Sequence, residues 1–517
     1  MSPLQRSVYW RLFLVYFFAP FLFFLDNFTV AIAAQTCRHD NATDAPASGP
    51  GQGSLQSNQS ERGEFSAGEA DWWTDILDQN SVCGWTDWLS YGQTSYMVGM
   101  LLGSLVGGAI SDKYGKRPLL LVSAFVHALC GIVPAVLPQP IVFLAIRCLT
   151  AFSCGCINIC VFSLAVEWTL PAARLWPPAF LSFCFSLGTM GAALLAWLSP
   201  TWTHLHLTVG LPQLVCLPLY LSLPESPRWL LLKKKTDVLE RYRGNSPADK
   251  QHLQLLLDLA LSDLQKAAET QTETPDRGGH AHSDLIHLRH PTILLHLFIM
   301  SFLSAAISLT YYGICLNIGS FGVGVYTAQF FSGLTEAPCL LVPLIRLGRR
   351  LISILALFLS GTACGLSFLL SRYNCEPILV MSLALLGKLC ILAACFISIL
   401  YSIELFPTVV RQRCISLVSL SFRIGSLTTT LLPSSPNGGI SLAAMVVYSS
   451  GPIVGCGLCL LLPETCGVPL PDSLEDCDRR SESHPAGMDG LWRTRKPVSS
   501  EVRILPPEKE DTFTPFI

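Results

Sequence analysis

Twelve separate apolar runs constrain this chain more than any other feature of its sequence. A helix needs roughly 20 mostly apolar residues to cross the hydrocarbon core of a bilayer. The runs have the approximate limits 9–34, 90–110, 118–138, 140–165, 178–199, 204–223, 292–314, 321–344, 351–371, 376–400, 413–433 and 441–463. A globular core does not require its apolar residues to be grouped in this way. The pattern therefore predicts an all-α membrane protein with twelve transmembrane helices.

The composition supports this prediction and excludes other classes. Of the 517 residues, 51% are hydrophobic and 14% are charged, whereas soluble domains carry about 25% charged residues. A net charge of −2 gives no basic field for a nucleic acid. The chain has no Gly-rich phosphate loop ending in Lys-Ser/Thr and no His-Glu-x-x-His motif. We therefore expect no enzyme, no cofactor and no metal site.

The basic residues predict the orientation in the membrane. The segment 35–89 has two basic residues against nine acids and carries glycosylation sequons at Asn41 and Asn58. Every second loop is instead basic, beginning with Lys113, Lys116 and Arg117. This places 35–89 outside and puts the N-terminus 1–8, the loop 224–291 and the tail 464–517 in the cytosol of a plasma-membrane protein. The tail is polar and rich in proline, and we interpret it as disordered.

The first run has a competing interpretation as a secretory signal peptide. Arg6 and Arg11 precede the run, and Ala31-Ile32-Ala33 resembles a cleavage site. The length of the run and the presence of Asp26 favour a transmembrane helix, and cleavage would leave an odd number of helices.

Two cysteines of the outer segment are expected to form a disulfide bond. Cys37 and Cys83 are the only cysteines of 35–89, and an oxidising compartment favours their pairing. Two free thiols are the alternative.

Three local patterns occur twice, which predicts an internal repeat. The stretch from Gly108 to Arg117 recurs 233 residues later, and Glu167…Arg174 recurs as Glu404…Arg411 after 237 residues. Pro224-Glu225-Ser226 recurs as Pro463-Glu464-Thr465 after 239 residues. The chain thus reads as two six-helix halves, 9–223 and 292–463, joined by the loop 224–291. Such halves place a substrate site between them near the midplane.

The repeated loops are candidates for conformational gating, because their charges can form a network on the cytosolic face that opens during transport. Plain interfacial salt bridges are the alternative interpretation. The gating candidates are Gly108, Asp112, Lys113, Gly115, Lys116, Arg117, Glu167, Arg174, Arg349, Glu404 and Arg411.

These motifs resemble a known family. Gly108-x-x-x-Asp112-Lys113-x-Gly115-Lys116-Arg117 is similar to the signature loop of the major facilitator superfamily. The stretches beginning at Pro224 and Glu404, together with Leu462-Pro463-Glu464-Thr465, resemble solute carrier family 22, the organic ion transporters. Tyr311-Tyr312-Gly313, Gly387-Lys388 and Arg423-Ile424-Gly425-Ser426 resemble the organic anion branch. The resemblance implies an anion site shaped by Arg423, Tyr311 and Tyr312, and exchange against a dicarboxylate.

Two departures from the family pattern indicate a divergent or orphan member. Ile345 stands where the second signature loop usually has Asp, and Leu340 stands where anion-branch members often have Lys. Both changes bear on how substrate movement is coupled to a conformational change or an exchange partner, and on which class of substrate is carried.

Four charged residues within the apolar runs are candidates for substrate binding, since a charge at the midplane is costly unless it is paired or hydrated. They are Asp26, Glu336, Lys388 and Arg423. Arg423 can clamp a carboxylate, with Tyr311 and Tyr312 as aromatic walls. Alternatively, Arg423 pairs with Glu336 and only joins two helices. If all four charges line one cavity, its net charge is zero and a zwitterion fits as well as an anion.

Two classes of function follow. The first is a secondary active or facilitative transporter of small organic ions, most plausibly anions, with zwitterions or cations as the alternative. The second is a non-transporting relative that acts as a binding or endocytic receptor. The expected partners are the lipid bilayer, a small organic ion and a counter-transported dicarboxylate, and no nucleic acid. The oligomeric state does not follow from the sequence.

Overall fold

The computed structural model describes residues 3–33, 86–89, 91–137, 139–170, 173, 176–242, 247–272, 290–338, 348–373, 375–407, 410–432 and 441–465. The predictions for Asn41, Asn58, the Cys37–Cys83 disulfide, Arg174, Leu340, Ile345 and the tail after Thr465 lie outside the described residues. In the described part all regular secondary structure is helical, with no β-strand.

The helices follow the predicted runs closely. In the first half of the chain they are α1 (Pro3–Phe23), α4 (Thr86–Leu89), α5 (Gly92–Tyr114), α6 (Lys116–Val136), α7 (Pro140–Glu167), α8 (Trp176–Leu198) and α9 (Trp202–Leu221). In the second half they are α14 (Pro291–Leu316), η3 (Ile318–Phe321), α15 (Val325–Glu336), α16 (Arg349–Arg372), α17 (Pro377–Leu405), α18 (Arg411–Leu431) and α19 (Leu442–Cys459).

Eleven helices in the described residues are long and apolar enough to cross a membrane. The first of them spans Pro3–Ala33, since the helix resumes at residues 25–33 after a bend at Phe24. The predicted run 321–344 is represented by the shorter α15, because 339–347 lie outside the described residues. Large apolar side chains such as Val122, Val215 and Ile378 are more than half exposed, as expected for a surface that faces lipid.

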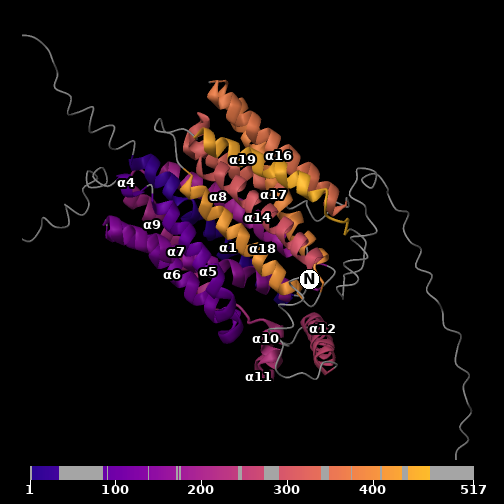
Figure 1. The fold of residues 1–517 in the computed structure, drawn as a ribbon. Helices are drawn as coiled ribbons and strands as arrows, with labels where there is room; N and C mark the ends of the chain where they lie inside the picture. Colours follow the sequence, from indigo (N-terminus) through magenta and orange to yellow (C-terminus); the bar gives the residue numbers. More distant parts are fainter. Residues whose placement is uncertain are drawn as a thin grey trace, which may run out of the picture.

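The helices form two packed groups that follow the order of the chain (Figure 1). In the first, α5 and α6 pack on α7, α1 on α8, and α6 on α9; in the second, α16 packs on α17 and α19, and α14 on α18. The groups meet where α15 packs on α8 and where α18 packs on α5. We call them the N-terminal and C-terminal groups; the residue limits of the predicted domains stay a prediction.

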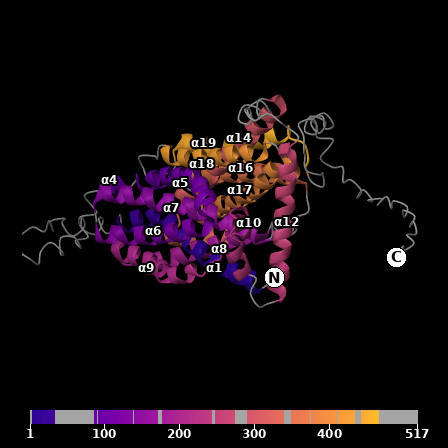
Figure 2. The same ribbon diagram turned by 90° about the horizontal axis from the view of Figure 1, so that it is seen from below.

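Three further helices lie at one end of the bundle. They are α10 (Pro227–Leu232), α11 (Thr236–Tyr242) and α12 (Pro247–Thr272). Helix α12 contains the stretch 253–264 that the sequence predicts as helical. It crosses the end of the bundle at which the N-terminus lies, while α4 lies at the opposite end (Figure 2). The backbone N–H of Leu4 donates to Asp249 Oδ1 at 3.0 Å, which joins α1 to α12.

Candidate functional site

Asp26 is neutralised by Arg147, which extends from α7. Arg147 Nη2 lies 2.6 Å from Asp26 Oδ2, and both side chains are almost fully buried. The guanidinium also donates to the carbonyl of Leu22 at 2.8 Å and stacks over the ring of Tyr96 at 4.6 Å. Because the two opposite charges are paired, together they add no net charge to the interior.

Glu336 and Lys388 form a second buried pair. Lys388 Nζ lies 2.6 Å from Glu336 Oε1, and the side chains are 0% and 3% exposed. Ser332 on α15 accepts a further bond from Lys388, and Tyr311 donates its hydroxyl to Glu336 at 2.7 Å. The alternative interpretation, in which Glu336 pairs with Arg423, is therefore wrong: Glu336 is held by α17 and α14.

Arg423 makes no ion pair with any described residue. Its guanidinium lies 5.8 Å from the ring of Phe422 and is partly exposed. The neighbouring ring of Phe422 lies 6.1 Å from that of Tyr312 on α14, and α18 packs on α5 of the N-terminal group. Arg423 thus lies at the boundary between the two groups of helices. Among the four predicted intramembrane charges, it is the one whose charge remains uncompensated.

A cluster of aromatic rings crosses the same boundary. Phe23 stacks on Tyr312 at 5.8 Å, and Tyr312 contacts Phe422 at 6.1 Å and Tyr311 at 5.2 Å. On the N-terminal side the cluster continues through Phe185, 6.2 Å from Phe23. We call these five residues the ring cluster. Next to an unpaired guanidinium, such rings can accept the apolar body of an amphipathic anion.

A cavity of about 310 Å³, which we call the outer cavity, is lined in part by Leu89 of α4 and Gln93 of α5. Helix α4 lies at the end of the bundle opposite α12 (Figure 2). Both groups contribute to the outer cavity: the end of the first span, the start of α5, the end of α14, the end of α18 and the start of α19. Asp26 is one of its lining residues, and its role in substrate binding stays a prediction. The volume of the cavity is within the range of small-molecule pockets.

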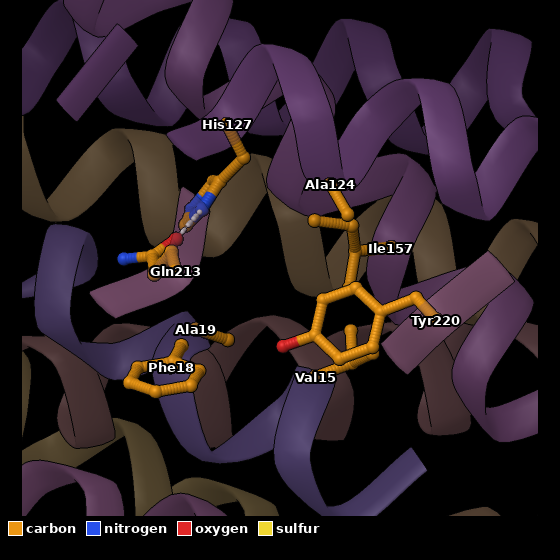
Figure 3. A pocket seen from close by; sticks show the side chains of 8 residues that line it. All are labelled: Val15, Phe18, Ala19, Ala124, His127, Ile157, Gln213 and Tyr220. Carbon is orange, nitrogen blue, oxygen red and sulfur yellow. Dashed lines mark hydrogen bonds between the residues drawn. The ribbon is translucent and has the colours of Figure 1, made fainter. Parts of the chain in front are cut away.

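A second cavity lies inside the N-terminal group and is much smaller, about 10 Å³. In Figure 3, His127 points toward Gln213, with a 2.8 Å hydrogen bond between His127 Nδ1 and Gln213 Oε1, and the Tyr220 ring closes the other side. A space of this size holds at most one water molecule. It is therefore not a site for an organic substrate.

The charges of the N-terminal group at the end of the bundle near α10 form one network. Glu225 accepts the backbone N–H groups of Lys116 and Arg117 at 3.1 Å, so it caps the start of α6. Lys116 pairs with Glu167, and Ser226 donates its hydroxyl to the same carboxylate. The network joins α6, α7 and the start of α10.

The C-terminal group repeats this network residue by residue. Glu464 accepts the backbone N–H groups of Arg349 at 2.7 Å and Arg350 at 3.1 Å. Arg349 pairs with Glu404 at 3.4 Å, and Thr465 donates to Glu404 at 2.6 Å. The repeat that the sequence predicts is thus present in the contacts as well as in the motifs.

Glycines allow the capping carboxylates to approach. A Cβ on Gly115 would lie 2.5 Å from Glu225 Oε2, and a Cβ on Gly348 would lie 2.5 Å from Glu464 Oε2. Gly115 also has a φ of +104°, which disfavours other residues. The glycine of each signature loop is therefore required by the cap.

The other gating candidates lie around this network. The side chains of Asp112 and Lys113 are exposed, and the carbonyl of Asp112 accepts from Trp229 Nε1 at 3.0 Å. Gly108 accepts the hydroxyl of Ser111 at 2.8 Å, and Arg411 donates to the carbonyl of Phe406 at 3.0 Å. Each ion pair that the structure describes joins helices of one group, so a gating role for these residues stays a prediction.

Sequence reasoning placed Glu225 and Glu464 in the repeat without assigning them to the site. The sequence shows that both glutamates follow their signature loops at matching distances. Only the fold shows that they accept hydrogen bonds from backbone N–H groups of Lys116, Arg117, Arg349 and Arg350. Arg147 and Ser332 were likewise absent from the candidate set. An arginine within an apolar run is the sequence feature that could have identified Arg147 as a candidate.

We predict that Glu225→Ala lowers the stability of the folded protein by about 2 kcal/mol, because backbone N–H groups at the start of α6 lose their acceptor. Thermal unfolding of the purified protein in detergent measures the effect. Glu240→Ala, on the exposed face of α11, is the matched control and should leave the unfolding temperature unchanged. Glu464→Ala should cost a similar amount, and the two losses should add; strongly unequal losses would contradict the repeat.

Comparisons with known proteins agree with this arrangement. Two groups of transmembrane helices around a boundary with an unpaired charge define a membrane transporter of the major facilitator fold. The model of the sugar (and other) transporter family matches residues 12–473. Solute carrier family 22 member 6 of Rattus norvegicus is 31% identical over 417 residues, which cover 79% of this chain and 74% of that protein. The chain belongs to this family of transporters and, within it, to solute carrier family 22.

Other relatives and solved structures are consistent with this membership. Solute carrier family 22 member 13 of Homo sapiens is 32% identical over 77% of this chain and 70% of its own length. Organic anion transporter 3 of Oryctolagus cuniculus is 28% identical over 78% and 73%. The xylose transporter XylE from E. coli, in an inward-open conformation, aligns with a TM-score of 0.57 at 16% identity, covering 91% of this chain and 99% of XylE. At that identity the likeness shows the fold alone, and it confirms the predicted fold class.

Proposed function

We propose that this protein transports small organic anions across the plasma membrane by alternating access of one site between its two groups of helices. The observation that carries the proposal is the charge of the interior. Asp26 and Glu336 are each neutralised by a buried base, which leaves Arg423 as the uncompensated charge beside the ring cluster. An unpaired guanidinium favours a carboxylate or sulfate over a cation. The names of the relatives, which include an organic anion transporter, support the same substrate class.

The pairing also bears on the zwitterion alternative. That alternative assumed that four charges face one cavity with a net charge of zero. Asp26 and Glu336 are each paired with their own base. A substrate would therefore meet one positive charge, that of Arg423. A simple anion therefore fits the interior better than carnitine-like zwitterions or cations do.

The orientation and the energy source belong to the same proposal. The placement of Lys and Arg in alternate loops supports cytosolic termini and a cytosolic loop 224–291. Exchange against an intracellular dicarboxylate would supply the driving force, since the chain has no nucleotide-binding loop of the Lys-Ser/Thr type.

The proposal predicts that Arg423→Ala lowers the saturable uptake of 6-carboxyfluorescein by at least about tenfold, because a charge-assisted contact with the carboxylate is lost. Uptake by cells that express the protein is measured and normalised to surface protein. Arg372→Ala removes an exposed arginine at the end of α16 and should leave the uptake unchanged. Arg423→Lys keeps the charge but not the bidentate geometry and should fall between the two.

Other results would decide against parts of the proposal. Uptake that survives Arg423→Ala would keep the transporter and remove Arg423 from the site. Binding and internalisation of the dye with no saturable uptake would favour the receptor alternative. Uptake of carnitine or an organic cation in place of the dye would overturn the substrate class.

A further inference from the structure

The outer cavity has polar walls whose buried atoms lack partners. Asp26 uses Oδ2 for Arg147, while its Oδ1 is buried and has no hydrogen-bond partner. The amide oxygen and the amide nitrogen of Gln93, the second residue of α5, are also buried without partners. Both residues line the cavity. Leaving a buried polar atom unpaired costs free energy, which a ligand in this cavity would recover.

Other polar side chains of the lining donate into the protein and away from the cavity. Asn27 donates to the carbonyl of Cys315 at 3.4 Å, and Thr430 donates its hydroxyl to the carbonyl of Leu427 at 2.9 Å. A threonine oxygen whose proton is used in this way offers only lone pairs to a neighbour. With Asp26 Oδ1 and Gln93 Oε1, the wall offers three oxygen acceptors beside one unpartnered donor, Gln93 Nε2, and this balance suits a ligand that brings a hydroxyl group.

The position of the cavity relative to Arg423 is set by the helices. Arg423 and Thr430 are seven residues apart on α18, which places them on the same face of the helix about 10 Å apart along its axis. On α14, Tyr312 precedes the lining residue Leu316 by one turn, and on the first span Phe23 precedes Asp26. Phe23 and Tyr312 of the ring cluster therefore lie next to the lining of the outer cavity, and Phe422, whose ring lies 6.1 Å from that of Tyr312, adjoins Arg423 on α18.

We propose that the outer cavity is a second binding compartment for the transported substrate and takes the hydroxyl-bearing end of an elongated organic anion. The carboxylate or sulfate lies at Arg423, the apolar middle lies among the rings, and a terminal hydroxyl donates to Asp26 Oδ1 or Gln93 Oε1. This proposal rests on the proposed function, and it narrows the substrate class to anions about two helical turns long with a donor at the far end.

Two matched acids test the proposal. Biphenyl-4-carboxylate and 4′-hydroxybiphenyl-4-carboxylate differ by one hydroxyl placed at the end far from the charge, at a distance comparable to the two-turn spacing on α18. Their dissociation constants for the purified full-length protein are measured from ligand-dependent thermal stabilisation, which does not require transport. We expect the hydroxylated acid to bind about tenfold more tightly, as one hydrogen bond to a buried acceptor allows. Benzoate and 4-hydroxybenzoate are too short to reach and should bind equally.

Variants assign the difference to the cavity. Gln93→Leu and Thr430→Val should each lower the tenfold ratio of the two biphenyl acids, because each removes an oxygen acceptor from the wall of the cavity. Gln412→Leu makes the same chemical change at an exposed position of α18 and should leave the ratio at about ten. A ratio near one in the wild type, or a ratio unchanged by both cavity variants, would overturn the proposal.

Failure of the proposed function gives a different result. In that case Arg423→Ala changes neither the binding of the biphenyl acids nor the uptake of the dye, whatever the ratio of the two dissociation constants. If binding depends on Arg423 and the ratio stays near one, the anion site stands, and the outer cavity holds only water.

Discussion

Replacing Lys388 by methionine should lower anion uptake by at least about tenfold, and replacing Glu336 by glutamine in the same chain should restore most of it. Lys388 is fully buried against Glu336, 2.6 Å away. Removing one partner of a buried ion pair leaves an uncompensated charge and is strongly destabilising. In Lys388→Met that charge is a carboxylate next to Tyr311, so the interior loses its net positive charge. Uptake of 6-carboxyfluorescein per surface molecule is the measurement.

The double variant distinguishes two roles of Lys388. If Lys388 only neutralises Glu336, the combination Lys388→Met with Glu336→Gln removes both charges, and Arg423 again dominates. If Lys388 contacts the substrate itself, as the sequence-based hypothesis states, the double variant stays as inactive as the single one. Lys250→Met, at an exposed position of α12, is the control for loss of a lysine and should transport normally.

Replacing Gly99 by alanine should prevent most of the protein from reaching the cell surface. A Cβ at this position would lie 2.0 Å from the carbonyl oxygen of Cys148 on α7. Backbone at that distance moves only if α5 and α7 separate, and such overpacking costs about 1–3 kcal/mol or more. Surface biotinylation and the unfolding temperature of the purified protein measure the loss.

The control for this prediction is an equally small change where space is open. Gly457 on α19 has no atom within 4 Å of an added Cβ, so Gly457→Ala should leave surface expression intact and raise helix stability slightly. Normal surface expression and uptake of Gly99→Ala would show that α5 and α7 approach less closely than described.

The spans, the repeat and the family were predictable from the sequence because each depends on local patterns. Runs of apolar residues near the length of a bilayer specify helices, and matched offsets such as that of Glu225 and Glu464 specify duplication. The helical stretch around Leu253 was also predicted correctly.

The pairing of the intramembrane charges was not predictable from these patterns. Asp26 and Arg147 are 121 residues apart. The periodicity within one helix does not determine which other helix will pack against that helix. Glu336, Lys388 and Asp26 were predicted as substrate contacts because each is a charge in an apolar run. Their enclosure by partners depends on packing between helices, and so does the isolation of Arg423.

The contacts that hold the two groups of helices together are mostly of a kind that is easily exchanged. They include ring stacks such as Phe28 on Tyr326 at 5.8 Å, the 3.4 Å hydrogen bond of Asn27 and that of Ser186 to Gly333 at 2.6 Å. Ring pairs contribute about 0.5–1.5 kcal/mol each, and the pairs Lys116–Glu167, Asp26–Arg147, Arg349–Glu404 and Glu336–Lys388 each stay within one group. Parting the groups thus breaks none of these four pairs. Arrangements that differ only in such contacts lie close in free energy, so a bound substrate that prefers one of them shifts their populations.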